Sequence, residues 1–185
     1  MDDRELRRRA ILLASRARGA TSPNPMVGAL ITKNGRILAE DYHRKPGTPH
    51  AEALVIKKAG SMARASTLYV SLEPCCHTDK RTPPCTREII HAGIKRVVIA
   101  MKDPNPKVSG KGIRELEEAG IAVNSGVLEE EAKRLNESYT KYITTKRPFV
   151  LLKIAMTMDG KIATDEGQSK WITGEKSRGM VHRLR

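Results

Sequence analysis

The chain has 185 residues, of which 39% are hydrophobic and 30% charged, as is typical of a soluble globular protein with one good core. No apolar run approaches the about 20 residues that span a bilayer, and the arginine-rich N-terminus lacks the apolar segment of a secretory signal. We therefore expect a cytoplasmic protein without a membrane partner. Its three cysteines would stay reduced there and do not form a disulfide framework.

The net charge of +13 favours an anionic partner. A solvated surface rich in lysine explains the same excess equally well. If the charge does serve binding, nucleic acid and a phosphorylated small molecule both fit it. Only 3% of the residues are aromatic, which leaves little material for stacking bases and argues against nucleic acid. Of these two partners, the composition favours the phosphorylated small molecule over nucleic acid, and it leaves a homo-oligomer open.

The spacing of apolar residues predicts alternating helices and strands over the first 145 residues. A helical pattern runs from residue 2 to about residue 18 and ends near Gly19. Asn34-Gly35 lies between two apolar runs and predicts a β-hairpin. The further predicted elements are a helix over 51–59, a strand over 67–72, a helix from Pro84 to Gly93, a strand over 96–101, a helix over 110–119, a strand over 121–123 and a long helix from 128 to about 145.

This order predicts an α/β sandwich with a mixed sheet. We divide the chain into a first domain, residues 1–146, and a segment over residues 147–185. In that segment, residues 149–155 have the pattern of a buried strand, residues 158–161 that of a turn, and a helix starts near Gly174. One strand, one loop and one helix cannot bury a core. We therefore expect the segment to be the incomplete opening of a second domain.

Two short stretches contain the residues best suited to bind metal. One contains His50 and Glu52, and the other begins with Cys75 and ends with Cys85. A His-x-Glu followed by Pro-Cys and a further cysteine is the arrangement of zinc-dependent nucleobase deaminases. The predicted helix puts the histidine and the glutamate in its first turn, where exposed N–H groups favour an anion. Our interpretation is that His50, Cys75 and Cys85 bind one zinc ion.

Such a site can activate water. Three protein ligands leave a fourth position for water, which is typical of catalytic rather than structural zinc. Zinc lowers the pKa of that water, so that a nucleophile is available near neutral pH to attack a ring carbon bearing an amino group. Glu52, which is not a ligand in this scheme, would carry protons from the water to the ring nitrogen and to the departing ammonia.

The spacing of the cysteines leaves other zinc sites open. The compact signature has two residues between its cysteines, whereas nine residues separate Cys75 from Cys85. Cys76 or His77 could therefore compete as a ligand. A purely structural zinc site that includes His77 is the alternative for the whole cluster, but it gives Glu52 no role.

Several segments, in this order, resemble a known family. TSPNPMVG, HRKPGTPHAE, YVSLEPCCHTDKRTPPC and AMKDPNPKVSGKG resemble the deaminase domain of the bifunctional riboflavin-biosynthesis deaminase/reductases. KIAMTMDGKIAT and QSKWITG resemble the start of the reductase domain in the same family. Together the segments span most of the chain. The long loop ending in TPPC is informative, because related tRNA adenosine deaminases use the short Cys-x-x-Cys spacing.

The resemblance implies a three-layer α/β/α, cytidine-deaminase-like domain followed by the beginning of a dihydrofolate-reductase-like domain. It implies hydrolytic deamination of 2,5-diamino-6-ribosylamino-4(3H)-pyrimidinone 5′-phosphate, which the complete protein follows by reducing ribosyl to ribityl. Zn²⁺ and NADPH are the implied cofactors. By motif match, His50, Cys75 and Cys85 are the zinc ligands and Glu52 is the proton carrier. The other implied contacts are Asn24, His43, Asp103 and Asn105 for pyrimidine and ribose, Lys80 or Arg81 for phosphate, Ser169 and Arg185 for the second substrate, and Ala155 and Trp171 for the second cofactor.

The chain departs from the family pattern, which has Pro-Cys-Ser-His-x-Gly before a basic residue and TPPC. Cys76 replaces the serine, no glycine follows, and one residue is added, so the register leaves both Lys80 and Arg81 open as the phosphate contact. A reductase domain that stops at Arg185 lacks most of its fold, so we expect no reduction by this chain alone. The alternative functions are a tRNA or nucleic-acid base deaminase and a non-enzymatic structural-zinc module.

Overall fold

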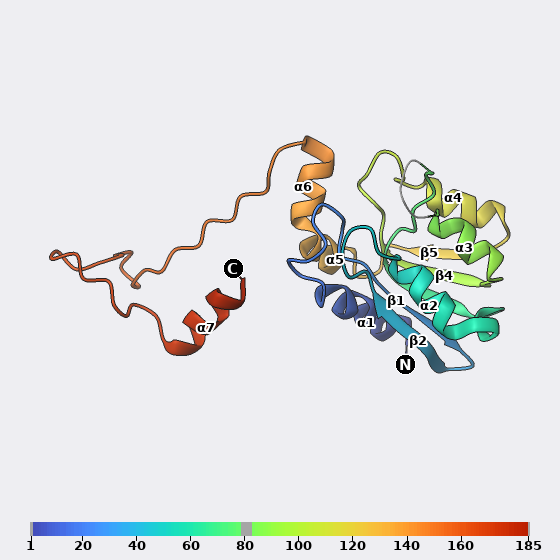
Figure 1. Cartoon of the computed structure of the whole chain (residues 1–185), viewed down its shortest axis with the longest axis horizontal. Helices are drawn as coiled ribbons and strands as arrows, with labels where there is room; N and C mark the ends of the chain where they lie inside the picture. Colours follow the sequence, from blue (N-terminus) through green and yellow to red (C-terminus); the bar gives the residue numbers. More distant parts are fainter. Residues whose placement is uncertain (1, 79–82, 185) are drawn as a thin grey trace. The chain divides into compact units, whose positions relative to one another are not determined.

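The computed structural model describes residues 2–78 and 83–184 (Figure 1). Its contacts divide the chain into two compact units, Met1–Phe149 and Val150–Arg185. Among the described residues, no helix combines the length and the apolar character that crossing a membrane would require.

The first unit is built on a mixed sheet with the strand order β2-β1-β3-β4-β5. β1 pairs antiparallel with both β2 and β3, whereas β3–β4 and β4–β5 are parallel. The hairpin predicted at Asn34-Gly35 is confirmed, and both turn residues have positive φ angles (50° and 73°), as a tight two-residue turn requires. The strands are β1 (Gly28–Lys33), β2 (Arg36–Tyr42), β3 (Thr67–Leu72), β4 (Arg96–Met101) and β5 (Ala122–Ser125).

Helices cover both faces of this sheet, so the predicted three-layer α/β/α architecture is confirmed (Figure 1). α1 and α5 contact each other on one face, and α2, α3 and α4 follow one another on the other face. The helices of this unit are α1 (Asp3–Ser15), α2 (Ala51–Ala59), α3 (Cys85–His91), α4 (Lys111–Glu118), α5 (Glu129–Leu135) and α6 (Glu137–Thr145), with a 3₁₀ turn, η1 (Gly60–Ala63), after α2.

The alternation of side chains along the central strands explains why both faces are covered. Leu30, Tyr69 and Val98 form one buried cluster with apolar residues of α1. Their neighbours along the strands, such as Leu68 and Val97, belong to the second buried cluster, which includes apolar residues of α2 and α3. Because successive strand residues point to opposite faces, strands that are apolar at every position need a helical layer on each side.

One predicted long helix is in fact two. Residues 128–145 form α5 and α6, which are separated at Asn136 (φ −104°, ψ 25°). The prediction of a continuous helix is wrong because the buried Asn136 side chain bonds the backbone of Met26, far away in sequence. A tertiary contact of this kind overrides local helix propensity.

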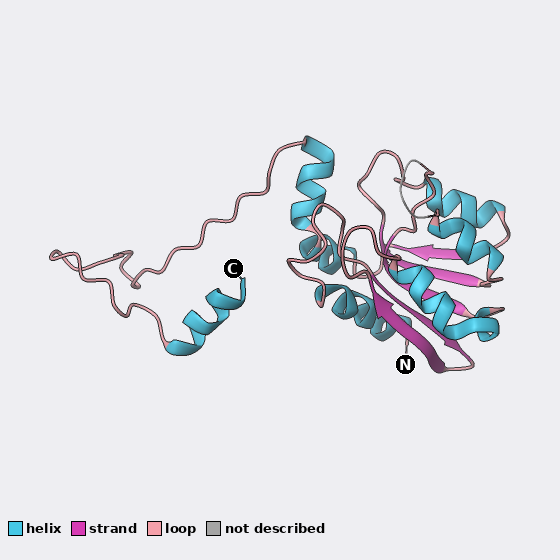
Figure 2. Cartoon of the chain, in the orientation of Figure 1, coloured by secondary structure: helices cyan, strands magenta, loops and turns pink. Residues whose placement is uncertain are grey.

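The second unit contains one helix, α7 (Glu175–Leu184), and no strand among its described residues (Figure 2). The helix and the turn after Thr157 were predicted, and the N–H of Gly160 donates to the carbonyl of Thr157 (3.0 Å). The strand predicted over residues 149–155 is wrong. This run is extended but has no partner strand in the described chain, and Val150 is 81% exposed.

Candidate functional site

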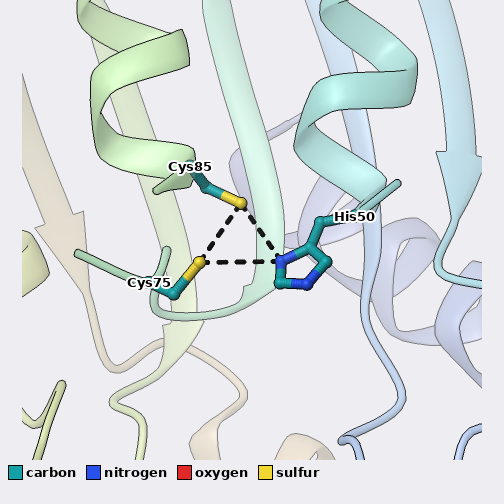
Figure 3. Close-up of side chains that lie close together, drawn as sticks. All are labelled: His50, Cys75 and Cys85. Carbon is teal, nitrogen blue, oxygen red and sulfur yellow. Dashed lines mark hydrogen bonds between the residues drawn. The ribbon is translucent and has the colours of Figure 1, made fainter. Parts of the chain in front are cut away.

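The three predicted metal ligands lie together, although they come from separate parts of the chain. His50 is the N-cap residue of α2, Cys85 is the first residue of α3, and Cys75 lies in the loop after β3. The parallel β3–α3–β4 arrangement brings the end of β3 next to the two helix N-termini. Their side chains point toward one another (Figure 3).

The triangle formed by the three ligand atoms has the size of a zinc site. His50 Nδ1 lies 3.3 Å from Cys85 Sγ and 3.6 Å from Cys75 Sγ, and the two sulfur atoms are 3.4 Å apart. A tetrahedral ion with the usual Zn–S and Zn–N bonds separates its ligand atoms by about 3.6–3.8 Å. Two thiols and one imidazole are also the donors that zinc prefers. The geometry therefore fits one zinc ion held by three protein ligands.

The two rival ligands are placed differently. Cys76 Sγ lies 3.9 Å from the carbonyl oxygen of Lys107, and the only cluster of potential ligands among the described residues consists of His50, Cys75 and Cys85. His77 lines the adjoining cavity without belonging to that cluster.

Glu52 lies in the first turn of α2, two residues after the histidine, and is only 3% exposed. Its Oε2 atom is buried and has no hydrogen-bond partner among the described residues. Burial raises the pKa of its carboxyl group, because ionisation is costly away from water. An unpartnered carboxylate oxygen in a cavity wall is suited to exchange protons with a bound molecule rather than to stabilise the fold.

A cavity of about 610 Å³ opens beside these residues. His50, Cys75 and Glu52 line it, and so do the four pocket residues predicted from the sequence, Asn24, His43, Asp103 and Asn105. The cavity is large enough for a nucleotide-sized ligand. Lys80 and Arg81, predicted as phosphate contacts, lie outside the described residues.

His43 orients the Asn24 side chain through a hydrogen bond. The ring is 2% exposed, its Nδ1 lies 3.2 Å from the carbonyl oxygen of Pro49, and its Nε2 lies 3.1 Å from Asn24 Nδ2. A carbonyl can only accept, so Nδ1 carries the proton and Nε2 accepts from the amide. Burial lowers the pKa of His43, in agreement with a neutral ring. The amide orientation is thus set, and the Asn24 carbonyl oxygen is available to a ligand.

Asp103, in the loop after β4, faces the same cavity and is 5% exposed. Its Oδ1 accepts from the N–H of Asn105 and from the hydroxyl of Tyr139, both at 2.9 Å. Burial, with the nearby charge of Glu73, raises the pKa of this carboxyl to about 6. Tyr139 was missed in the sequence analysis. The signal available was its spacing from Tyr142, because residues three apart share one helix face and both tyrosines line the cavity.

The raised pKa predicts a pH dependence of stability. Between the ordinary value of 3.8 and about 6, the unfolded chain has lost the Asp103 proton while the folded chain keeps it. The free energy of unfolding should therefore fall by about 3 kcal/mol as the pH rises through this window. Asp103→Asn removes this loss, so the variant should gain about that much relative to the parent between pH 4 and pH 7. Urea unfolding of both proteins at both pH values measures the difference, and parallel pH profiles would contradict it.

The predicted residues of the second unit lie in a different environment. Ser169 is exposed, Ala155 is half-buried, and Trp171 is 70% exposed with the guanidinium of Arg178 4.2 Å from its ring centre. Arg185 lies outside the described residues.

Comparison with known families gives two matches. The model of the cytidine and deoxycytidylate deaminase zinc-binding region matches residues 1–101, which include His50, Glu52, Cys75 and Cys85. The model of the RibD C-terminal domain matches residues 148–185.

Curated relatives match over the whole chain. Riboflavin biosynthesis protein RibD of Aquifex aeolicus is 53% identical over 183 residues, which are 99% of this chain and 51% of that protein. RibD of Actinobacillus pleuropneumoniae is 51% identical over 185 residues, which are 100% of this chain and 49% of that protein. The chain thus spans about half the length of the curated relatives it matches.

A solved structure from Thermotoga maritima is similar with a TM-score of 0.91 and 51% identity, over 98% of this chain and 52% of that one. That protein is described as a diaminohydroxyphosphoribosylaminopyrimidine deaminase/5-amino-6-(5-phosphoribosylamino)uracil reductase.

Proposed function

The chain belongs to the cytidine and deoxycytidylate deaminase zinc-binding family, and on that premise we propose that it is a zinc-dependent deaminase of riboflavin biosynthesis. The proposed reaction converts 2,5-diamino-6-ribosylamino-4(3H)-pyrimidinone 5′-phosphate and water into 5-amino-6-(5-phosphoribosylamino)uracil and ammonia. The observation that carries it is the cluster of three zinc-type ligands, of which His50 and Cys75 line the cavity together with Glu52. The Oε2 atom of that buried carboxylate has no hydrogen-bond partner among the described residues.

The proposed ligands are His50, Cys75 and Cys85. A zinc ion held by these three protein ligands would keep its fourth position for a water molecule and would lower the pKa of that water. Glu52 would take one proton from the attacking water and deliver it to the ring nitrogen. It would then take the remaining proton from the newly attached hydroxyl group and deliver it to the amino group, which leaves as ammonia while the carbonyl forms. Its burial suits this work, because a carboxylate whose pKa is raised above the ordinary range is a stronger base and takes up a proton more readily.

The other cavity residues orient the ring and the sugar. The Asn24 carbonyl oxygen, turned outward by the bond from its amide to His43, accepts from a ring N–H or amino group. Asp103 and Asn105 are proposed contacts of the ribose side of the substrate. Lys80 or Arg81 remains the proposed partner of the phosphate, and the positive net charge of the chain favours this anionic ligand.

Residues 147–185 are proposed to begin the second, reductase domain. The match of residues 148–185 to the RibD C-terminal domain supports this. In that domain NADPH would reduce the ribosyl group, with Ala155 and Trp171 as proposed cofactor contacts and Ser169 and Arg185 as proposed substrate contacts.

The test measures ammonia release by the purified, zinc-loaded chain from the diaminopyrimidine phosphate, with product identified by mass spectrometry. We expect turnover that stops when zinc is removed by a chelator and returns with one equivalent of zinc. A tRNA substrate, offered in parallel, should release no ammonia. Turnover of tRNA alone would support the nucleic-acid deaminase instead, and stoichiometric zinc without any turnover would support a structural zinc module.

A further inference from the structure

Asn136, at the junction of α5 and α6, is 1% exposed. The Met26 N–H donates to its Oδ1 (2.8 Å), and its Nδ2 donates to the Met26 carbonyl (3.0 Å). One amide side chain therefore satisfies both backbone groups of a residue 110 positions away. An asparagine before a helix usually caps that helix, but the Asn136 side chain makes no cap bond to α6. Both polar atoms of its side chain instead form hydrogen bonds with the backbone of Met26.

The two ends of this contact lead to two segments that line the cavity. Asn24 lies two residues before Met26, in a segment that runs along the cavity wall. Tyr139 lies about one helical turn after Asn136, and its hydroxyl donates to Asp103 (2.9 Å). A chain of contacts thus runs from Asn24 through Met26, Asn136 and Tyr139 to Asp103. Every link is a backbone connection or a hydrogen bond, and both of its terminal side chains line the cavity.

We propose that Asn136 is a positioning residue that fixes the distance between Asn24 and Asp103, and so sets the fit of the substrate. This inference rests on the proposed function, because it gives Asn24 and Asp103 the role of substrate contacts. Asn136 itself is not among the residues that line this cavity and is not a member of the cluster of metal ligands. Its loss should therefore act on substrate binding more than on the chemical step.

The Asn136 amide provides both an acceptor for the Met26 N–H and a donor for the Met26 carbonyl. Alanine leaves both the N–H and the carbonyl of Met26 without this partner. Aspartate has the same shape and still accepts from the N–H, but it sets a carboxylate oxygen against the Met26 carbonyl, where neither atom can donate. Asn136→Asp is thus the sharper variant, since it changes the pairing and keeps the volume.

The experiment compares steady-state deamination by the parent chain, Asn136→Asp and Asn136→Ala, each normalised to bound zinc. We expect KM to rise about tenfold, the size of one lost buried hydrogen bond, while kcat per zinc changes less than threefold. Ser66→Ala is the matched control. Its buried hydroxyl donates to Ala63 (2.6 Å) at the start of β3, away from the cavity residues, so it should cost stability without changing KM.

A double-mutant cycle with Tyr139→Phe tests the link to Asp103. Asn136→Asp and Tyr139→Phe should be non-additive in KM, because each breaks the same chain of contacts. Additive effects, or Asn136 variants with the parental KM, would overturn the proposal. If Asn136→Ala does not fold, the isosteric aspartate variant and this cycle decide the question.

Hydrogen exchange gives a readout that needs no substrate. In Asn136→Asp, amides around Met26 and around Asp103 should both exchange faster, whereas Ser66→Ala should leave both segments unchanged. Faster exchange at Met26 alone would overturn the coupling. If the parent chain releases no ammonia from the diaminopyrimidine phosphate, the proposed function fails, while the exchange result still decides whether Asn136 couples the segment around Met26 to the segment around Asp103.

Discussion

Replacing Glu52 with glutamine should lower kcat for deamination by about 10²- to 10⁴-fold, the usual contribution of a positioned acid–base group. Glutamine has nearly the same volume but cannot take up and give back a proton at neutral pH. Glu52 makes no bond through Oε2 that the amide would break. Burial raises the pKa of this carboxyl, so a neutral side chain removes an electrostatic cost, and the variant should be at least as stable as the parent.

The measurement is turnover per bound zinc, together with zinc content by atomic absorption and the midpoint of thermal unfolding. Glu117→Gln is the matched control, because Glu117 is exposed on α4 and its replacement changes the net charge by the same amount as Glu52→Gln. A loss of zinc together with activity in Glu52→Gln would assign the carboxylate to the metal site. Parental turnover with full zinc content would exclude Glu52 as the proton carrier.

The local parts of this site could be predicted because each depends on a short stretch. The helix that starts after His50 and stops at Gly60 follows from its apolar spacing and its glycine, and α2 has these bounds in the structure. The prediction that His50 approaches Cys75 and Cys85 follows from one chemical argument: reduced cysteines and a histidine near two helix starts share a metal. The three ligand atoms lie within 4.8 Å of one another.

The long-range polar contacts could not be predicted in the same way. Tyr139 and Asn136 both fell within the one long helix that was predicted from residue 128 to about residue 145. Their partners, Asp103 and Met26, lie 36 and 110 positions away. Apolar periodicity records which face of an element is buried, but it does not record which backbone group a polar side chain will meet.

The strand predicted over residues 149–155 is wrong for a different reason: the apolar pattern is present, but a partner strand is not among the described residues of this unit. Its apolar pattern is real, since Val150 and Leu152 are large hydrophobic residues, but they are 81% and 77% exposed. Apolar alternation indicates a segment suited to a sheet, whereas a strand forms only when a second backbone supplies the hydrogen bonds. The described residues of this unit supply none.

Glu73 is a residue whose replacement should strongly reduce the stability of the first unit. It precedes the loop of Cys75, is 2% exposed and accepts from three backbone N–H groups. Its Oε2 accepts from Asp103 (3.2 Å) and Gly110 (2.9 Å), and its Oε1 accepts from Ile113 (3.2 Å). The carboxylate also lies at the N-terminus of α4, where the helix dipole favours a negative charge.

The surrounding backbone is too close for another side chain to compensate. A Cβ atom on Gly112 would lie 2.2 Å from the carbonyl oxygen of Pro74, so α4 packs directly on the chain that leads to Cys75. Glu73→Ala leaves three N–H groups without their acceptor in this tight space. Each such group costs about 1–3 kcal/mol, so the loss of the acceptor for all three should lower the free energy of unfolding by at least about 3 kcal/mol.

Glu73→Gln separates the charge from the shape. The amide can turn its oxygen to the pair of donors from Asp103 and Gly110, but its NH₂ group then faces the N–H of Ile113, and no bond can form between two donors. We expect about 1–3 kcal/mol of destabilisation, between the parent and the alanine variant. Glu118→Gln, an exposed acid at the other end of α4, should cost less than about 0.5 kcal/mol. Urea unfolding with and without zinc measures the series. Because Glu73 accepts a hydrogen bond from the loop that carries Asp103, Glu73→Gln should also raise KM. If Glu73→Gln were as stable as the parent, the three hydrogen bonds to Glu73 would not be what holds this loop.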